Sequence, residues 1–204
     1  MPFAAQHIKA GRLHLQKADP VMKKIIKQVG PFTCKLRRDR FLTMVRSIVS
    51  QQISGAAART IQGRLVDAVK PATITPETLL QFNVDALREI GVSRQKAAYM
   101  LDLAAKVHDG TVDLRNIGRK TDEEVTDELT QVKGIGVWTA QMFMMFSLGR
   151  LDVFPDGDLG IQNAIKKNYP VRGELTRKKI LQIAEPWSPY ATIASWYLWR
   201  SLEV

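Results

Sequence analysis

The sequence is poor in the residues that most often build metal and redox centres. It contains one cysteine, Cys34, and three histidines, His7, His14 and His108. One thiol cannot form an intrachain disulfide, a cysteine-rich zinc site or a cysteine-held iron–sulfur cluster. The histidines are too far apart in the chain for a helical metal-binding motif. We therefore expect chemistry that depends on neither a metal nor another cofactor.

Long hydrophobic runs are missing as well. The N-terminus has no apolar segment of the kind found in signal peptides. The longest apolar stretch, Val137 to Leu148, contains Thr139 and Gln141 and is too short to span a bilayer. We expect a monomer that has no membrane partner and is located in the cytoplasm, or in the nucleus if the source is eukaryotic.

Acidic residues are outnumbered by basic ones. The 204 residues carry a net charge of +10 with a pI near 9.9, although their hydrophobic and charged contents are ordinary for a globular protein. Such a balance favours an anionic partner, either nucleic acid or a membrane surface. Charge alone also fits a basic protein that binds no polyanion. The candidate phosphate contacts are Arg37, Arg38, Arg40, Arg94, Lys96, Lys166 and Lys167.

Hydrophobic periodicity and capping residues predict helices along most of the chain. No segment alternates in the manner of a strand with hairpin turns, so we expect an all-α fold with two helical lobes and a cleft between them. In the first half of the chain, the expected helices run from Asp19 to Gly30 and over 41–49, 57–69 and 93–108, with one helix that begins at Thr75 and another that ends at Ile90. In the second half, one helix begins at Thr121 and enters a glycine turn. The others run over 137–148, from Asp158 through Ile165, over 175–184, and from Ser188 through Trp199.

A glycine hairpin lies at the centre of the functional hypothesis. In the segment Val132–Ala140, Gly134 and Gly136 flank Ile135, and a helix follows. Glycines adopt backbone angles that other residues resist and let a phosphate approach the main chain, while Ile135 would pack inward. Two alternatives remain. One is a dinucleotide fingerprint, although a helix precedes the turn and Thr139 replaces the third glycine. The other is an ordinary connection between helices.

A loop with a single acid at the start of a helix follows this hairpin. Asp158 comes 22 residues after Gly136, within the segment Val153–Gly160. An acid at this place is usually a helix cap, and Asp156 could serve as that cap equally well. A backbone clamp for phosphate, followed by one carboxylate, nevertheless suggests chemistry on a sugar or a base.

These two segments, with the apolar helix 142–148, resemble the helix–hairpin–helix DNA glycosylases that have a Gly/Pro-rich loop and a following aspartate. The similar branch is 3-methyladenine DNA glycosylase II. The resemblance implies a hairpin lobe over 41–160, a second lobe from 1–40 and 161–204, and an active-site cleft between them. It also implies excision of alkylated purines, such as 3-methyladenine and 7-methylguanine, from double-stranded DNA after base flipping. The hairpin carbonyls would hold a sodium or potassium ion.

The resemblance also assigns roles to particular residues. Asp158 matches the catalytic acid, whereas Asp156 falls at a variable loop position. Trp138 stands where bifunctional relatives carry a Schiff-base lysine, which indicates a monofunctional glycosylase. A bifunctional glycosylase/lyase and a non-catalytic DNA-binding module remain as alternatives. The other implied site residues are Trp138, Trp199 and Met142 in the base pocket, Lys133, Gly134, Ile135, Gly136 and Thr139 in the DNA-binding hairpin, and Gln52 as the wedge that enters the gap left by a flipped base.

Overall fold

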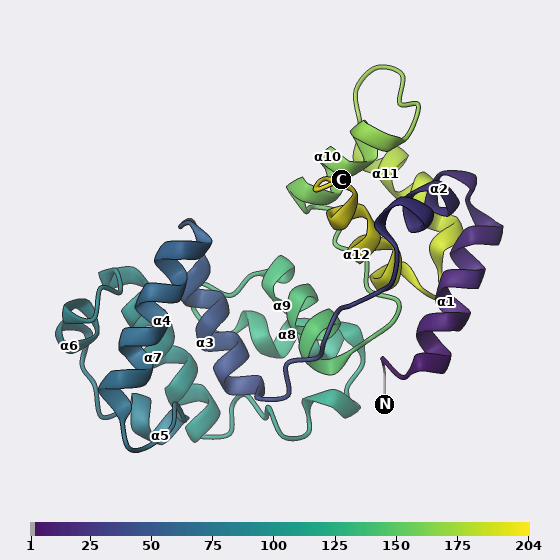
Figure 1. Ribbon diagram of the computed structural model, residues 1–204. Helices are drawn as coiled ribbons and strands as arrows, with labels where there is room; N and C mark the ends of the chain where they lie inside the picture. The colour runs from purple at the N-terminus through teal and green to yellow at the C-terminus, as the bar shows by residue number, and fades with distance from the viewer. Residues whose placement is uncertain (1–2) are drawn as a thin grey trace. The chain divides into compact units, whose positions relative to one another are not determined.

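The computed structural model describes residues 3–204 and is helical throughout, with no strand in that range. The predicted all-α fold is confirmed. Over the same residues, no helix combines the length and the apolar character needed to cross a membrane. The chain forms two compact units (Figure 1): unit 1 consists of Met1–Leu36 and Met144–Val204, and unit 2 of Arg37–Phe143.

Unit 2 contains the hairpin. Within it, α7 packs against α3, α5 and α6, while α9 packs against α3 and α8. The buried side chains include Met44, Ile48, Leu65, Leu87 and Met100. Its elements are α3 (Arg40–Ser50), α4 (Gly55–Val69), α5 (Pro76–Leu79), α6 (Val84–Glu89), α7 (Arg94–His108), η1 (Ile117–Arg119), α8 (Asp122–Thr130) and α9 (Val137–Phe143).

Helix starts in unit 2 follow from local side-chain chemistry. The Thr121 hydroxyl accepts the Glu124 N–H, and the Glu124 carboxylate accepts the Thr121 N–H, which closes a capping box at the start of α8. Ser93 caps α7 and Asp39 caps α3, each through a side-chain oxygen that accepts one backbone N–H of the first turn. The predicted starts at Ser93 and Thr121 are therefore confirmed.

Unit 1 is organised around its last helix. Helix α12 packs against α1, α2 and α10, and α1 also packs against α2 and η3. Because α12 is surrounded, Ile193, Trp196, Tyr197 and Leu198 are all buried. The elements are α1 (Ala5–Ala18), α2 (Pro20–Val29), η2 (Met144–Leu148), α10 (Leu159–Asn168), α11 (Arg177–Ala184), η3 (Glu185–Trp187) and α12 (Ala191–Ser201).

Helix α1 has no counterpart in the sequence-based assignment. It begins after Ala4, which supplies no side-chain cap, and its first turn contains no acid. Its position comes from tertiary packing instead. A Cβ on Gly11 would lie 2.5 Å from Ile193 Cδ1, so the lack of a side chain there lets α1 approach α12 closely.

A buried carboxylate ties several elements of unit 1 together. Asp19 is 6% exposed, and its Oδ1 caps α2 by accepting the Val21 and Met22 N–H groups. Its Oδ2 accepts the Tyr169 hydroxyl at 2.6 Å and the Trp187 indole N–H at 2.9 Å. Burial and this bond raise the pKa of Tyr169. Four donors satisfy one carboxylate, as a buried charge requires.

The unit boundaries differ from the expected lobes at 40 and 160. Arg40 belongs to unit 2, where its guanidinium donates to the carbonyls of Leu114 and Arg115. Residues 144–160 belong to unit 1, because Phe146 packs on Trp199 at 5.9 Å between ring centroids. The stretch Val137–Leu148, expected as one helix, changes from α to π geometry after Phe143.

Replacing the buried cap tests this anchoring role. We expect Asp19→Ala to destabilise the protein by about 3–5 kcal/mol, because the Tyr169 and Trp187 donors lose their buried acceptor. The exposed cap Asp39, whose carboxylate accepts only the Leu42 N–H among the described contacts, provides the control. Asp39→Ala should cost about 1 kcal/mol. Urea unfolding of both variants measures the difference, and equal losses would contradict the assignment.

Candidate active site and DNA-binding elements

The hairpin between α8 and α9 has the geometry that its glycines predict at one position. Gly134 has φ +79°, and a Cβ there would lie 2.1 Å from the Tyr99 ring. No other residue fits both constraints. Ile135 is 4% exposed, which confirms that its side chain anchors the turn.

Two hairpin residues differ from their expected roles. Gly136 is not among the described residues with positive φ, and a Cβ there would meet nothing within 4 Å. Gly136 therefore contributes open space before the first turn of α9, and its backbone does not need the left-handed conformation that favours glycine. Thr139 is 5% exposed. Its side chain is therefore buried, whereas an exposed hydroxyl would have been needed for a side-chain contact with DNA.

Lys133 presents an exposed side chain while its backbone is fixed. Its N–H donates to Asp102 Oδ2 at 2.8 Å, and the Lys106 ammonium reaches the same oxygen at 2.6 Å. Burial opposes ionisation of Asp102, but the bonds from Lys106 and Lys133 outweigh it, so the pKa of Asp102 lies below its usual value. The ionised carboxylate therefore holds the start of the hairpin against α7.

The predicted wedge residue has an unusual backbone. Gln52 lies in the loop between α3 and α4, its side chain is exposed, and its φ is +54°. Within residues 3–204 it is the one non-glycine residue with positive φ. This conformation costs about 1–3 kcal/mol for a side chain other than glycine, and such strain is typical of functional sites.

The wedge loop and the hairpin are joined through Gln51. Gln51 Nε2 donates to the Gly134 carbonyl at 2.9 Å. The Lys96 ammonium donates to the carbonyls of Val49 and Gln51 at 2.8 and 2.5 Å, and burial lowers its pKa. These bonds fix both ends of the loop segment that precedes Gln52.

The same contacts correct part of the expected phosphate-binding set. Lys96 is used to hold the wedge loop, and Arg40 holds the carbonyls of Leu114 and Arg115. Lys167 donates to the carbonyls of Ser201 and Val204. Each of these cations supports the protein backbone. The remaining expected residues, Arg37, Arg38, Arg94 and Lys166, have exposed side chains.

Asp158 lies at the start of α10 in unit 1. Its Oδ1 accepts the Ile161 N–H and the Trp199 indole N–H, each at 2.8 Å. A helix N-terminus stabilises negative charge through its aligned dipoles. The carboxylate is thus both the helix cap that the local sequence suggests and the acceptor of the Trp199 indole N–H.

The contact between Asp158 and Trp199 depends on a glycine. A Cβ on Gly160 would lie 2.9 Å from Trp199 Cδ1 and 3.0 Å from Asp158 Oδ1. Any larger residue would separate the indole from the carboxylate. Gly160 and Phe146, which packs on the Trp199 ring, are site residues that sequence reasoning did not single out. The glycine two residues after the acid was the available signal.

The loop before Asp158 is held on the beginning of α12. Thr192 exchanges hydrogen bonds with Val153 through its hydroxyl. The Asp152 carboxylate accepts the Ala191 N–H and the Ser188 hydroxyl, so it supplies the cap that Tyr190 does not. These bonds determine where the chain delivers Asp158.

Asp156 has a different environment from Asp158. Its carboxylate pairs with Arg177, and its side chain is 16% exposed whereas that of Arg177 is 79% exposed. Its backbone carbonyl accepts the Gln162 amide at 3.3 Å. These contacts support a structural role for Asp156, in agreement with its variable loop position.

The expected base-pocket residues are divided between the units. Trp138 and Met142 lie on α9 directly after the hairpin, and Trp138 is 46% exposed. Trp199 lies on α12 beside Asp158. Trp196, by contrast, is 9% exposed and packs against Phe32 and, edge to face, against Tyr197, so it belongs to the core.

Hairpin carbonyls are the candidates for an ion ligand set. The Val132 carbonyl accepts the Ile135 N–H, and the Gly134 carbonyl accepts Gln51 Nε2. Each keeps one lone pair, so a monovalent cation could share these oxygens. In the range 3–204, no three His, Cys, Asp or Glu side chains gather in a metal-binding cluster.

Comparison with known proteins agrees with this arrangement. Residues 45–189 match the model of the HhH-GPD superfamily of base excision DNA repair proteins. The chain is 34% identical to YfjP of Bacillus subtilis over 78% of its own length, and spans 58% of that protein.

Two solved structures are similar over nearly the whole chain. The DNA-3-methyladenine glycosidase of Bacillus halodurans has a TM-score of 0.81 at 39% identity, with 91% of this chain and 85% of that chain covered. The Schizosaccharomyces pombe 3-methyladenine DNA glycosylase Mag1, in complex with abasic DNA, has a TM-score of 0.85 at 30% identity, with coverage of 96% and 97%. With its hairpin, its following aspartate and this match, the chain belongs to the HhH-GPD superfamily of base excision DNA repair proteins.

Proposed function

We propose that this protein is a monofunctional DNA glycosylase that hydrolyses the N-glycosidic bond of alkylated purines in double-stranded DNA. The observation that carries the proposal is the Asp158 carboxylate, held at a helix N-terminus by Ile161 N–H and Trp199 Nε1. The names of the similar glycosidase and of Mag1 support the substrate class. Because one chain carries all the expected parts, we propose a monomer that acts wherever the source organism keeps its DNA.

Unit 2 supplies the DNA-binding elements in this proposal. A phosphate lies in the open space before α9, where Gly136 leaves room and the first N–H groups of a helix have no partner within the helix. Exposed cations, including Lys133, add attraction that carries no sequence information. Gln52 fills the gap left by the extruded nucleotide, whose removal from the stack costs a few kcal/mol.

Unit 1 supplies the charge for bond cleavage. As the C1′–N bond breaks, its electron pair moves to the cationic base and neutralises it, while positive charge develops on the sugar. The Asp158 carboxylate stabilises that charge. Water then adds to C1′, and its proton passes to Asp158 or to solvent. The aromatic face of Trp199, whose indole N–H bonds Asp158, attracts the cationic base before it leaves.

The identity of residue 138 supports a single activity. Bifunctional relatives carry out backbone cleavage through a lysine two residues after the second hairpin glycine, and a tryptophan cannot form a Schiff base. A base that is already cationic needs no acid to protonate it. One carboxylate is therefore sufficient for the proposed reaction.

Incubation with methylated duplex DNA tests the function directly. We expect release of 3-methyladenine and 7-methylguanine and an uncut abasic strand, with no protein–DNA adduct after borohydride reduction. Chromatography of released bases and gel analysis of the strand measure both results. Efficient trapping would establish the lyase alternative, and binding without release would establish the non-catalytic module.

The two loop acids should differ sharply in their contribution to catalysis. We expect Asp158→Asn to lower the rate of base release at least about a hundredfold, the range found when one preorganised electrostatic group is removed. Asn still caps α10 and accepts the Trp199 N–H, so folding and DNA affinity should persist. Asp156→Asn weakens an ion pair to the exposed Arg177 and leaves the contacts of Asp158 in place, so its rate should stay within about twofold of wild type. Single-turnover rates decide, and a reversed order would refute the assignment.

Gln52 allows folding and function to be separated. Gln52→Gly relieves the strained backbone, so thermal stability should rise or stay constant. Excision from duplex DNA should nevertheless fall, because the space left by the flipped base stays empty. Excision from a single strand needs no wedge and should change little. Gln52→Ala, which keeps the strain, should show the same duplex defect without the gain in stability. Equal losses on both substrates would argue against a wedge.

A further inference from the structure

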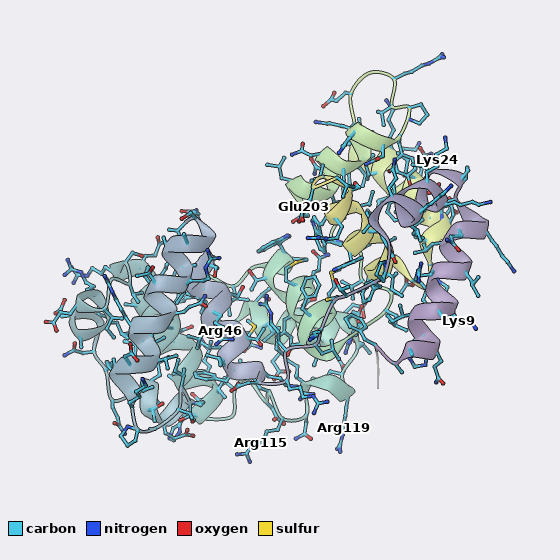
Figure 2. The ribbon with its side chains drawn as sticks, in the orientation of Figure 1. Lys9, Lys24, Arg46, Arg115, Arg119 and Glu203 are labelled. Carbon is cyan, nitrogen blue, oxygen red and sulfur yellow. The ribbon has the colours of Figure 1, made fainter. Side chains whose placement is uncertain are left out.

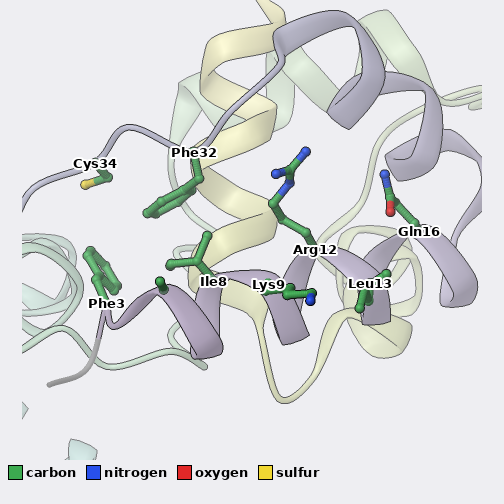
Figure 3. A pocket seen from close by; sticks show the side chains of 9 residues that line it. Phe3, Ile8, Lys9, Arg12, Leu13, Gln16, Phe32 and Cys34 are labelled. Atoms are coloured by element: carbon green, nitrogen blue, oxygen red, sulfur yellow. The ribbon is translucent and has the colours of Figure 1, made fainter.

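Unit 1 carries a pocket that shares no residue with the Asp158 site. It has a volume of about 530 Å³ and lies between α1 and the segment that follows α2. Phe3, Ile8 and Phe32 gather on one side, and the Arg12 guanidinium extends beside them (Figure 3). Lys9 supplies a second cation, and none of the described residues that line the pocket is acidic.

The Arg12 guanidinium is incompletely hydrogen-bonded. Its Nε is buried without a hydrogen-bond partner among residues 3–204. Its charge acts on the buried Tyr197. Burial raises the pKa of Tyr197 above its usual value, and the nearby Arg12 charge opposes only part of this increase. A buried donor without an acceptor is costly, and a guanidinium pairs best with a carboxylate or a phosphate. The pocket is therefore preorganised for an anionic group.

The opposite side of the pocket is apolar and rigid. Phe3 and Phe32 meet edge to face at 5.4 Å, and Phe32 packs in turn on Trp196 at 4.6 Å. Because Trp196 belongs to the core, the Phe32 ring has little freedom. Leu13, which is 48% exposed, extends the apolar rim. An occupant of this side buries a large apolar side chain.

The charge of the surrounding segment has one sign. Residues 1–36 contain seven lysines and arginines but a single acid, Asp19, and so supply six of the ten net positive charges. Asp19 is buried and already accepts four hydrogen bonds. Lys9 on α1 and Lys24 on α2 are exposed to solvent (Figure 2). This field attracts an acidic partner over a distance of about a Debye length.

We propose that this pocket binds an acidic peptide segment of a partner protein. One carboxylate of the peptide pairs with Arg12, and a neighbouring large apolar side chain packs against Phe3 and Phe32. A DNA backbone would satisfy the cations but would leave the apolar side in contact with water. A peptide that combines acids with an aromatic residue satisfies both halves of the pocket.

Fluorescence anisotropy with a labelled peptide, Asp-Asp-Asp-Leu-Phe, tests the proposal. Wild-type protein should bind it, and peptides with Asn in place of Asp or Ala in place of Phe should bind weakly. Arg12→Gln should weaken binding at least about tenfold, the effect of losing a charge-assisted hydrogen bond. Lys24→Gln removes the same charge outside the pocket and should weaken binding much less than Arg12→Gln does, because it reduces only the long-range attraction. Leu13→Glu places a negative charge on the exposed rim of the pocket and should abolish binding of the acidic peptide.

Three results would overturn the proposal. The first is an equal loss in Arg12→Gln and Lys24→Gln, which would mean attraction by net charge alone. The second is no binding of the peptide by wild-type protein. The third is loss of duplex DNA affinity in Arg12→Gln that matches its loss of peptide affinity, which would make the pocket a DNA contact. Base release from a short methylated duplex should be the same in wild type and Arg12→Gln. Peptide binding can therefore fail while the proposed glycosylase activity stands.

Discussion

The hydrogen bond from the Trp199 indole to the Asp158 carboxylate is the contact on which the candidate site depends. It joins the start of α10 to the end of α12, and it forms because Gly160 leaves the indole room. Phe146 holds the other side of the ring. The preceding loop is fixed on α12 by Asp152 and Thr192. The carboxylate thus has a defined position before any ligand arrives, as electrostatic catalysis requires.

Unit 2 holds its loops through backbone carbonyls together with one carboxylate, Asp102. The ammonium of Lys96 ties the loop between α3 and α4 to α7 through the carbonyls of Val49 and Gln51. The amide of Gln51 links the same loop to the hairpin through the Gly134 carbonyl. Asp102 fixes the first residue of the turn by accepting the Lys133 N–H. Lys96, which the sequence suggests as a DNA contact, instead forms hydrogen bonds that hold the DNA-binding elements in place.

Local signals in the sequence were sufficient for the fold class and for part of the site. The caps at Asp19, Ser93 and Thr121 and the glycine at 134 each act within a few residues, so their effects could be predicted. Helix α1 could not, because its position depends on the distant Ile193. Lys96 was assigned to phosphate because nothing nearby in sequence reveals its carbonyl partners. The role of Gly160 could not be predicted either, because the Trp199 indole that it leaves room for is distant in the sequence.

The left-handed backbone of Gln52 determines at which step the cost of ordering this loop is incurred, during folding or during DNA binding. A flexible loop would lose conformational entropy at each encounter with DNA. Here the loop is already ordered, with Gln51 tied to the hairpin and residue 52 strained in the free protein. The cost therefore belongs to folding and is incurred once. If Gln52 is the residue that enters the DNA helix, the ordering of this loop adds nothing to the cost of opening each base pair that the protein probes.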